Sequence, residues 1–182
     1  ISAAIGAFFA GRIADAFGRV RCMLFASDLF LISAIGSGIP FGISDFILWR
    51  VIGGFGIGMA SIIAPIYIAE TAPAHLRGRL GSMQQFAIVI GIFVALLSNY
   101  LIVRIAGSAN NPMIGNVKAW QVMFWVEIIP AILYGYAAWK LPESPRYLIH
   151  KGFIEQAQKV LAQINPEGVD KEVETIQSSF KN

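Results

Sequence analysis

Residues 50–86, RVIGGFGIGMASIIAPIYIAETAPAHLRGRLGSMQQF, indicate the fold more directly than any other stretch of the chain. A glycine-rich apolar run has one arginine, Arg50, at its start and one glutamate, Glu70, at its end. A short basic turn follows, and a second apolar run then opens with paired glutamines. Neither Val51–Ala69 nor Leu80–Val103 contains a charged residue. Apolar runs of about 20 residues match the roughly 30 Å core of a bilayer, so the sequence predicts membrane helices.

The composition excludes an ordinary soluble domain. Hydrophobic residues make up 56% of the chain and charged residues only 14%, whereas soluble domains carry about 25% charge. The net charge of +3 comes from short loops and a polar tail, so it does not indicate nucleic-acid binding. Cys22 is the only cysteine, which excludes an intrachain disulfide. We find no metal-ligand cluster, catalytic triad or phosphate loop in the sequence, and we expect neither a cofactor nor an enzyme.

Five membrane spans are expected, the first of them truncated because the chain begins inside an apolar run. In order, the predicted spans are Ile1–Ala10, Cys22–Gly42, Phe46–Ala69, Leu80–Val103 and Trp120–Trp139. Lysine and arginine gather in the first and third loops and after the fifth span. The positive-inside rule therefore places these segments on the cytoplasmic side of the cell's inner membrane. The loop 107–118, on the opposite side, is polar and rich in asparagine and glycine.

The chain becomes water-soluble in character after Pro145. Apolar residues recur at helical spacing in Phe153–Ile164 and again in Val169–Phe180. Pro166 and Gly168 interrupt the pattern between them. The sequence therefore predicts two short cytoplasmic helices, each packed by one face against another part of the protein.

Three segments on the predicted cytoplasmic side combine acids with arginines. They are GRIADAFGRVR (11–21), PIYIAETAPAHLRGR (65–79) and LPESPR (141–146), and their candidate residues are Asp15, Arg19, Glu70, Arg77, Glu143 and Arg146. A single surface salt bridge contributes only about 0–1 kcal/mol. A network that exists in one conformation and breaks in another can still bias a two-state equilibrium. The alternative for the first segment is a solvated loop that only fixes topology.

Taken in order, these motifs resemble the N-terminal half of a sugar porter of the major facilitator superfamily, most closely the bacterial and cyanobacterial-type glucose or fructose permeases. The resemblance covers nearly the whole chain, and its matching residues are Gly11, Asp15, Gly18, Arg19, Arg50, Gly53, Gly54, Gly56, Gly58, Pro65, Tyr67, Glu70, Arg77, Gly78, Gln85, Pro142, Glu143, Ser144, Pro145 and Arg146. Two positions depart from the family pattern. Val20 stands where a second arginine is frequent, and Asp28 where a small apolar residue is usual.

The resemblance implies an all-α, polytopic membrane protein with the major facilitator fold. Residues 1–141 are expected to form family helices two to six, and residues 142–182 the linker helices that lead to a C-terminal half missing from this chain. The implied function is transport of a hexose by alternating access, driven by proton symport, with the sugar bound between the halves. The expected partners are a monosaccharide, protons, the lipid bilayer and the missing half. A facilitative uniporter and a sugar sensor that does not transport are the alternatives.

A polar stripe on the fourth span is the candidate sugar site. A sugar needs groups that both donate and accept hydrogen bonds, as carboxamides do. Gln85, Ile88, Ile92 and Asn99 fall on one helical face. The resemblance implies sugar contact for Gln85 and apolar walls from the two isoleucines. Gln84 is the alternative register, and helix packing is the alternative role for these amides.

Two charged residues lie within the predicted spans. Arg50 lies about five residues from the outer end of its span and Glu127 about seven residues from the outer end of its own, so their depths are similar. A charge in lipid costs several kcal/mol, so each needs a partner. Arg50 and Glu127 can pair with each other or share an acid from a preceding helix. The resemblance implies a role in proton coupling or gating, and the alternatives are snorkelling of Arg50 and a static pair.

Overall fold

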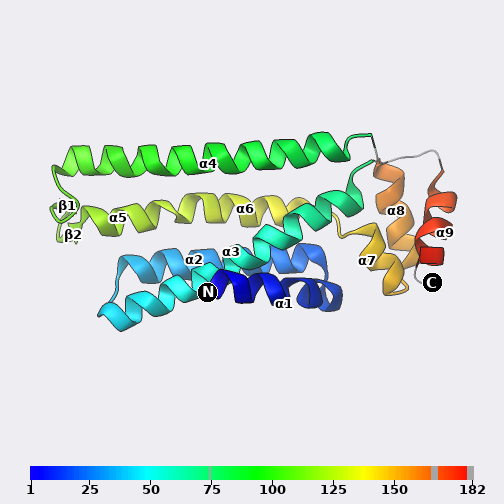
Figure 1. Cartoon of the computed structure of the whole chain (residues 1–182), viewed down its shortest axis with the longest axis horizontal. Helices are drawn as coiled ribbons and strands as arrows, with labels where there is room; N and C mark the ends of the chain where they lie inside the picture. The colour runs from blue at the N-terminus through cyan, green and yellow to red at the C-terminus, as the bar shows by residue number, and fades with distance from the viewer. Residues whose placement is uncertain (74, 165–167, 180–182) are drawn as a thin grey trace.

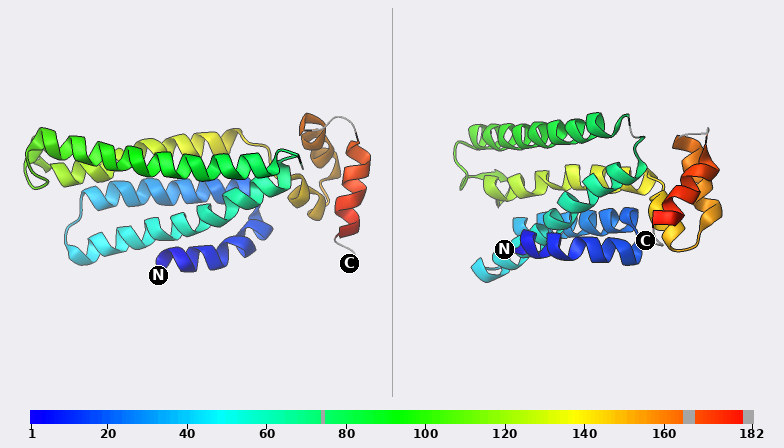
Figure 2. Two further views of the ribbon diagram at one scale, coloured as in Figure 1. Left: turned by 45° about the horizontal axis from the view of Figure 1, so that its top comes forward. Right: turned by 45° about the vertical axis from the view of Figure 1, so that its right-hand side comes forward.

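Helices make up nearly all of the regular structure in the computed structural model, which describes residues 1–73, 75–164 and 168–179 (Figure 1). In chain order the elements are α1 (Ser2–Phe17), α2 (Arg19–Gly38), α3 (Ile43–Thr71), α4 (Arg77–Ala106), β1 (Pro112–Ile114), β2 (Val117–Lys118), α5 (Ala119–Val126), α6 (Ile128–Lys140), α7 (Pro145–His150), α8 (Ile154–Ile164) and α9 (Val169–Ser179). The long helices share one general direction, with the two strands at one end and α7, α8 and α9 at the other (Figure 2). The predicted all-α class is confirmed.

The described residues contain four segments that are long and apolar enough to cross a membrane. They are Arg19–Gly38, Ile43–Thr71, Arg77–Ala106 and Ala119–Lys140. These segments correspond to the predicted second to fifth spans, with ends displaced by a few residues. The predicted first span, Ile1–Ala10, is helical too, but α1 continues to Phe17.

The connection between α1 and α2 is tighter than the sequence suggests. Sequence reasoning treats 11–21 as a loop, whereas α1 runs to Phe17 and α2 starts at Arg19, so Gly18 alone joins them. Gly18 has a φ of 104°, a region that residues with a Cβ rarely adopt. A Cβ at this position would also collide with the carboxylate of Glu143. Glycine is therefore required both by the backbone and by its neighbour.

The predicted fifth span, Trp120–Trp139, is divided into α5 and α6 at Glu127. Pro130 provides the physical reason, because it has no N–H to donate to the carbonyl of Val126 four residues earlier. Glu127 N donates instead to the nearer carbonyl of Phe124, at 3.1 Å. The predicted span is therefore present as Ala119–Lys140, but its helix is interrupted at Glu127, which lies at a helix junction.

A short antiparallel hairpin, which sequence reasoning does not predict, lies in the polar loop between α4 and α5. Ile114 of β1 faces Val117 of β2. Gly115, between the strands, has a φ of 59°. Glycine and asparagine at two successive turn positions favour tight hairpins of this kind.

Small residues allow α3 to pack closely against α1. A Cβ on Gly58 of α3 would collide with the backbone carbonyl of Ala3 in α1, and one on Gly6 of α1 would collide with the carbonyl of Phe55. Membrane helices commonly approach one another through small residues in this way. The core that α1, α2 and α3 share with α6 is formed by Ala10, Ala14, Val20, Cys22, Met23, Ala26, Met59, Ile63, Tyr67 and Ala138.

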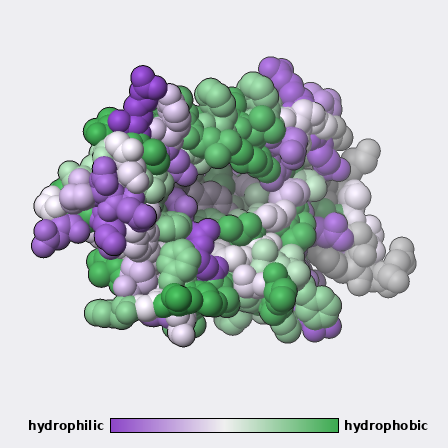
Figure 3. All heavy atoms as spheres, turned by 60° about the vertical axis from the view of Figure 1, so that its left-hand side comes forward, coloured by the Kyte–Doolittle hydropathy of each residue, from purple (hydrophilic) through white to green (hydrophobic). Residues whose placement is uncertain are grey.

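The fourth span, α4, is much less covered than the others. It runs beside α5 and α6 (Figure 1), yet Ile102 is the only one of its residues that is buried. Phe93 and Leu96 are 64% and 65% exposed. Figure 3 shows a hollow in one face of the molecule, bordered by both hydrophobic and hydrophilic residues. Apolar surface on this scale is unfavourable in water and suits contact with lipid or other protein segments.

The three C-terminal helices pack together beyond the end of the long helices. Two of them, α8 and α9, correspond to the predicted helices 153–164 and 169–180, although Pro166 and Phe180 lie outside the described residues. The short helix α7 is not predicted. Their shared core consists of Leu148, Ile149, Ala157, Val160, Leu161 and Val173.

Candidate functional sites

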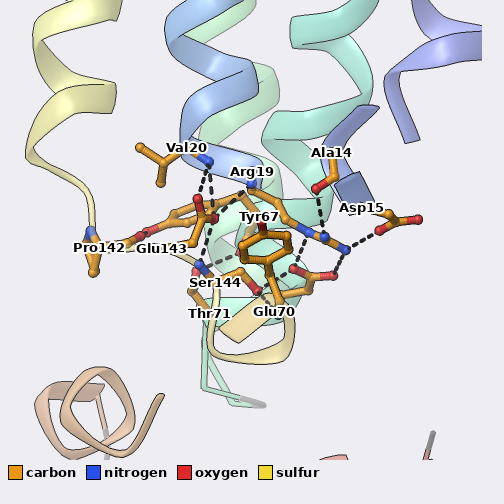
Figure 4. Close-up of polar contacts among 11 residues, drawn as sticks. Ala14, Asp15, Arg19, Val20, Tyr67, Glu70, Thr71, Pro142, Glu143 and Ser144 are labelled. Atoms are coloured by element: carbon orange, nitrogen blue, oxygen red, sulfur yellow. Dashed lines mark hydrogen bonds and ion pairs between the residues drawn. The ribbon is translucent and has the colours of Figure 1, made fainter. Parts of the chain in front are cut away.

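A bidentate ion pair between Arg19 and Glu70 joins the start of α2 to the end of α3 (Figure 4). Arg19 Nε donates to Glu70 Oε2 and Arg19 Nη2 to Glu70 Oε1, both at 2.9 Å. Arg19 Nη1 donates to Ala14 O at 3.1 Å, and Nη2 lies 2.9 Å from Asp15 Oδ1. The side chains of Arg19 and Glu70 are each only 10% exposed. A buried charge pair with this many partners is a structural contact, and Arg19 is not a solvated loop residue.

Glu143 binds the N-terminus of α2 from a distant part of the chain. Its Oε1 accepts hydrogen bonds from Arg19 N at 2.9 Å and Val20 N at 3.2 Å, although 124 residues separate Glu143 from Arg19. The N-cap residue of α2 is Gly18, which has no side chain to cap the helix. The carboxylate therefore satisfies free N–H groups of α2 and lies at the positive end of its dipole.

Ser144 also belongs to this site, although sequence reasoning names it only as a family-matching position. Its buried Oγ donates to Glu70 Oε2 at 2.5 Å and accepts from Tyr147 N at 3.4 Å as the N-cap of α7. Serine followed by proline is a helix-start signal, so the sequence held a signal for the cap but none for the contact with Glu70. Tyr67 Oη donates to Pro142 O at 2.8 Å and ties α3 to the segment before α7. We call Asp15, Arg19, Glu70, Glu143 and Ser144 the Arg19–Glu70 cluster.

Arg77 and Arg146, the other predicted members, lie beside the Arg19–Glu70 cluster. Together with Glu70 they line a cavity of about 420 Å³. Arg77 Nη2 is 3.5 Å from Ala72 O, while the carboxylate of Glu70 accepts hydrogen bonds from Arg19 and Ser144. Arg146 lines a second cavity, of about 430 Å³, together with Arg19. The six predicted residues thus share one end of the bundle, with Arg77 outside the pair that Glu70 forms.

Arg50 and Glu127 meet at a second polar site, within the spans. Arg50 Nη1 lies 3.6 Å from Glu127 Oε2, and the guanidinium lies over the ring of Phe124, 5.2 Å from its centroid. The side chains are 44% and 53% exposed. The sequence predicts similar depths for these two charges. The structure brings them together at the α5–α6 junction, close to Pro130.

The predicted sugar stripe lies on α4, the span with the fewest covering contacts. Ile88 is 48% and Ile92 57% exposed. Gln85 is exposed, whereas Gln84 and Asn99 are half-buried. The described residues of other helices do not cover this stripe, so the structure does not assemble a closed pocket around it.

The family model for sugar (and other) transporters matches residues 1–182. The chain belongs to the sugar transporter family. Its similarity to a glucose transport protein of Synechocystis sp. is 56% identity over 98% of the chain and 38% of the relative. An Escherichia coli D-xylose-proton symporter is 38% identical over 90% of the chain and 36% of that protein.

The solved structures similar to this sugar transporter chain have the same fold. The proton:xylose symporter XylE of the major facilitator superfamily, bound to 6-bromo-6-deoxy-D-glucose, matches with a TM-score of 0.90 at 35% identity, over 100% of this chain and 41% of that one. The inward-open form of XylE from E. coli matches with a TM-score of 0.86. The predicted family and fold are therefore confirmed. The chain spans only about 38% of the length of the glucose transport protein it matches.

Proposed function

We propose that this chain is part of a carrier that moves a monosaccharide across the membrane by alternating access, coupled to proton symport. The observation that carries the proposal is the 56% identity to a glucose transport protein over nearly the whole chain. Relatives named as D-xylose-proton and arabinose-proton symporters favour the coupling. A hexose, glucose or fructose, is the proposed solute. A uniporter and a non-transporting sensor remain the alternatives that the test below must separate.

Gln85 is the proposed hydrogen-bonding contact with the sugar. Its carboxamide both donates and accepts, which suits hydroxyl groups. Gln85 is exposed, and Ile88 and Ile92 expose apolar surface of the kind that packs against a sugar ring. Asn99 offers a second amide further along α4. Gln84 is half-buried, which makes it the weaker candidate for the sugar contact.

Arg50 and Glu127 are the proposed coupling pair. A charge inside a bilayer is costly and needs a partner, and these two side chains supply one another with it. The Arg50–Glu127 separation of 3.6 Å is longer than a short charge-assisted hydrogen bond, and both groups are about half exposed. The carboxylate can therefore exchange its arginine partner for a proton when the carrier changes conformation.

The Arg19–Glu70 cluster, with Arg77 and Arg146 beside it, is the proposed latch of one conformational state. Contacts that hold one arrangement of helices and break in the other bias such an equilibrium. The positive-inside rule places this end on the cytoplasmic side of the inner membrane. Residues 1–141 are then the membrane bundle, and residues 142–182 form the cytoplasmic linker.

Transport by the full-length carrier in proteoliposomes tests this function. D-Glucose and D-fructose uptake are measured with and without an inward proton gradient, together with sugar exchange at equilibrium. Gln85→Ala is expected to weaken glucose affinity by about tenfold to a hundredfold, because the hydrogen bonds that the amide makes to the bound sugar are lost. Gln84→Ala is the matched control and is expected to leave the affinity within about twofold of the wild type.

The same assay separates the alternatives. Uptake that no proton gradient accelerates would identify a uniporter, and sugar binding without uptake would identify a sensor. Glu127→Gln is expected to abolish gradient-driven accumulation while glucose exchange continues. An equal loss of both activities in Glu127→Gln would contradict the coupling role.

A further inference from the structure

A cavity of about 490 Å³ lies between α2, α3, α4 and the α5–α6 junction, apart from the Arg19–Glu70 cluster. Arg50, Glu127 and Tyr134 are the polar groups that can carry or share a proton in its lining. Ser33 of α2 also lines the cavity, but its Oγ already donates a hydrogen bond to Trp49 O at 2.8 Å. A space of this size with charged and hydroxyl groups on its wall has room for several waters, since one occupies about 30 Å³ in the liquid.

Tyr134 carries a polar atom that its surroundings do not satisfy. Its hydroxyl is buried and has no hydrogen-bond partner within the described part of the chain. Its ring packs against Phe30, with centroids 6.0 Å apart, so the side chain is held by apolar contact alone. A buried hydroxyl without a partner is unfavourable, and a water in the adjoining cavity is the partner within its reach.

The positions of Tyr134 and Glu127 indicate the path along which such a water can pass a proton. The two residues lie about two helical turns apart along the same helical face, roughly 10 Å. Long side chains in a helix lean toward its N-terminus, which turns Tyr134 toward Glu127. The polar groups of the cavity therefore follow α6 from Glu127 toward the end at Lys140.

We propose that Tyr134 is a positioning residue for proton coupling, whose hydroxyl holds a water that relays the proton of Glu127 toward the Lys140 end of α6. The inference rests on the coupling role proposed for Glu127. In the step, the Glu127 carboxyl gives its proton to the water held by Tyr134, and that water gives a proton to a second water. Tyr134 keeps its own proton throughout, so no further reactant is required.

Tyr134→Phe in the full-length carrier tests the inference, because it removes one oxygen and keeps the ring that packs on Phe30. Tyr136→Phe is the matched control, since Tyr136 is on the same helix and 58% exposed. Glucose-driven proton uptake is followed with a pH dye inside proteoliposomes across a range of pH, beside glucose exchange at equilibrium. Tyr134→Phe is expected to slow proton uptake about tenfold, a loss of order one hydrogen bond, and to shift its pH profile. Glucose exchange is expected to stay within about twofold of the wild type.

The outcomes are distinct. Identical proton uptake in Tyr134→Phe and Tyr136→Phe, while Glu127→Gln abolishes uptake, would overturn the role of Tyr134 and leave the coupling proposal intact. Equal slowing of proton uptake and glucose exchange would overturn it as well, since that is a structural effect. A wild-type carrier that moves no protons with glucose would overturn both. If Tyr134→Phe does not reach the membrane, Tyr134→Gln and Tyr134→Leu replace it, and only the glutamine variant is expected to retain rapid proton uptake.

Discussion

Replacing Arg19 with lysine tests whether the Arg19–Glu70 cluster depends on the shape of the guanidinium or only on its charge. Arg19 Nε and Nη2 each donate to one oxygen of Glu70, and Nη1 reaches Ala14 O at 3.1 Å. A lysine ammonium is a single point of charge without this fork, so it cannot meet both Glu70 oxygens and the carbonyl together. Arg19→Lys therefore removes about two hydrogen bonds while the positive charge remains.

The size of the effect follows from burial. Hydrogen bonds to charged groups contribute about 1.5–3 kcal/mol each, and the 10% exposure of both side chains leaves little screening by water. Two lost bonds sum to about 3–6 kcal/mol, and the lysine ammonium, which has three donors, recovers about half of this by turning a second donor toward water or the nearest freed acceptor, so we expect a net loss of roughly 2–3 kcal/mol in the free energy of unfolding. At about 2 °C per kcal/mol, the value for larger chains, the melting temperature falls by about 4–6 °C.

The assay is thermal unfolding of the purified full-length carrier in detergent, followed by tryptophan fluorescence. Arg21→Lys is the control, because Arg21 lies two positions away on the same helix and is exposed. Its melting temperature is expected to move by no more than about 1 °C, as is usual for surface substitutions. Equal melting temperatures for the two variants would refute the reasoning, since charge alone would then account for the contact.

Two further substitutions can be measured in the same unfolding assay. Gly58→Val should lower the free energy of unfolding by about 1–3 kcal/mol, since its side chain collides with the backbone of Ala3. Gly91→Val, which meets open space on α4, should change it little, and equal losses would contradict close packing as the cause. Glu143→Gln should lower it by about 1 kcal/mol, because the N-terminus of α2 loses a negative charge but keeps an acceptor oxygen. An unchanged melting temperature would show that the charge is not needed there.

Much of the fold could be predicted from the sequence because the membrane imposes simple constraints on length and charge. The uncharged runs Val51–Ala69 and Leu80–Val103 lie within α3 and α4. The matched depths of Arg50 and Glu127 follow from a constant rise per residue in two helices that run in the same direction. Depth alone does not place two side chains next to each other, and the 3.6 Å contact depends on how the helices are arranged around the bundle.

Two features that the sequence leaves open have a common physical origin, since both depend on contacts between segments far apart in the chain. Gly18 can act as a one-residue turn because Glu143 supplies the cap that glycine lacks. The partner of Glu70 is Arg19 on another helix, although Arg77 is nearer in sequence. The break at Glu127 is different, because Pro130 was visible in the sequence and its missing N–H predicts a local interruption.

The two polar sites are linked mechanically by α3. Arg50 and Glu70 belong to this helix, about 20 residues and therefore roughly 30 Å apart along its axis. Between them, Gly58 packs directly on the backbone of α1, and such close packing resists small deformations. A movement of the end of α3 that breaks the Arg19–Glu70 pair is therefore expected to be transmitted along the helix and to displace Arg50 relative to Glu127. The candidate sugar residues lie on α4, which has few contacts with α1 and α3, so solute binding can change without repacking their core.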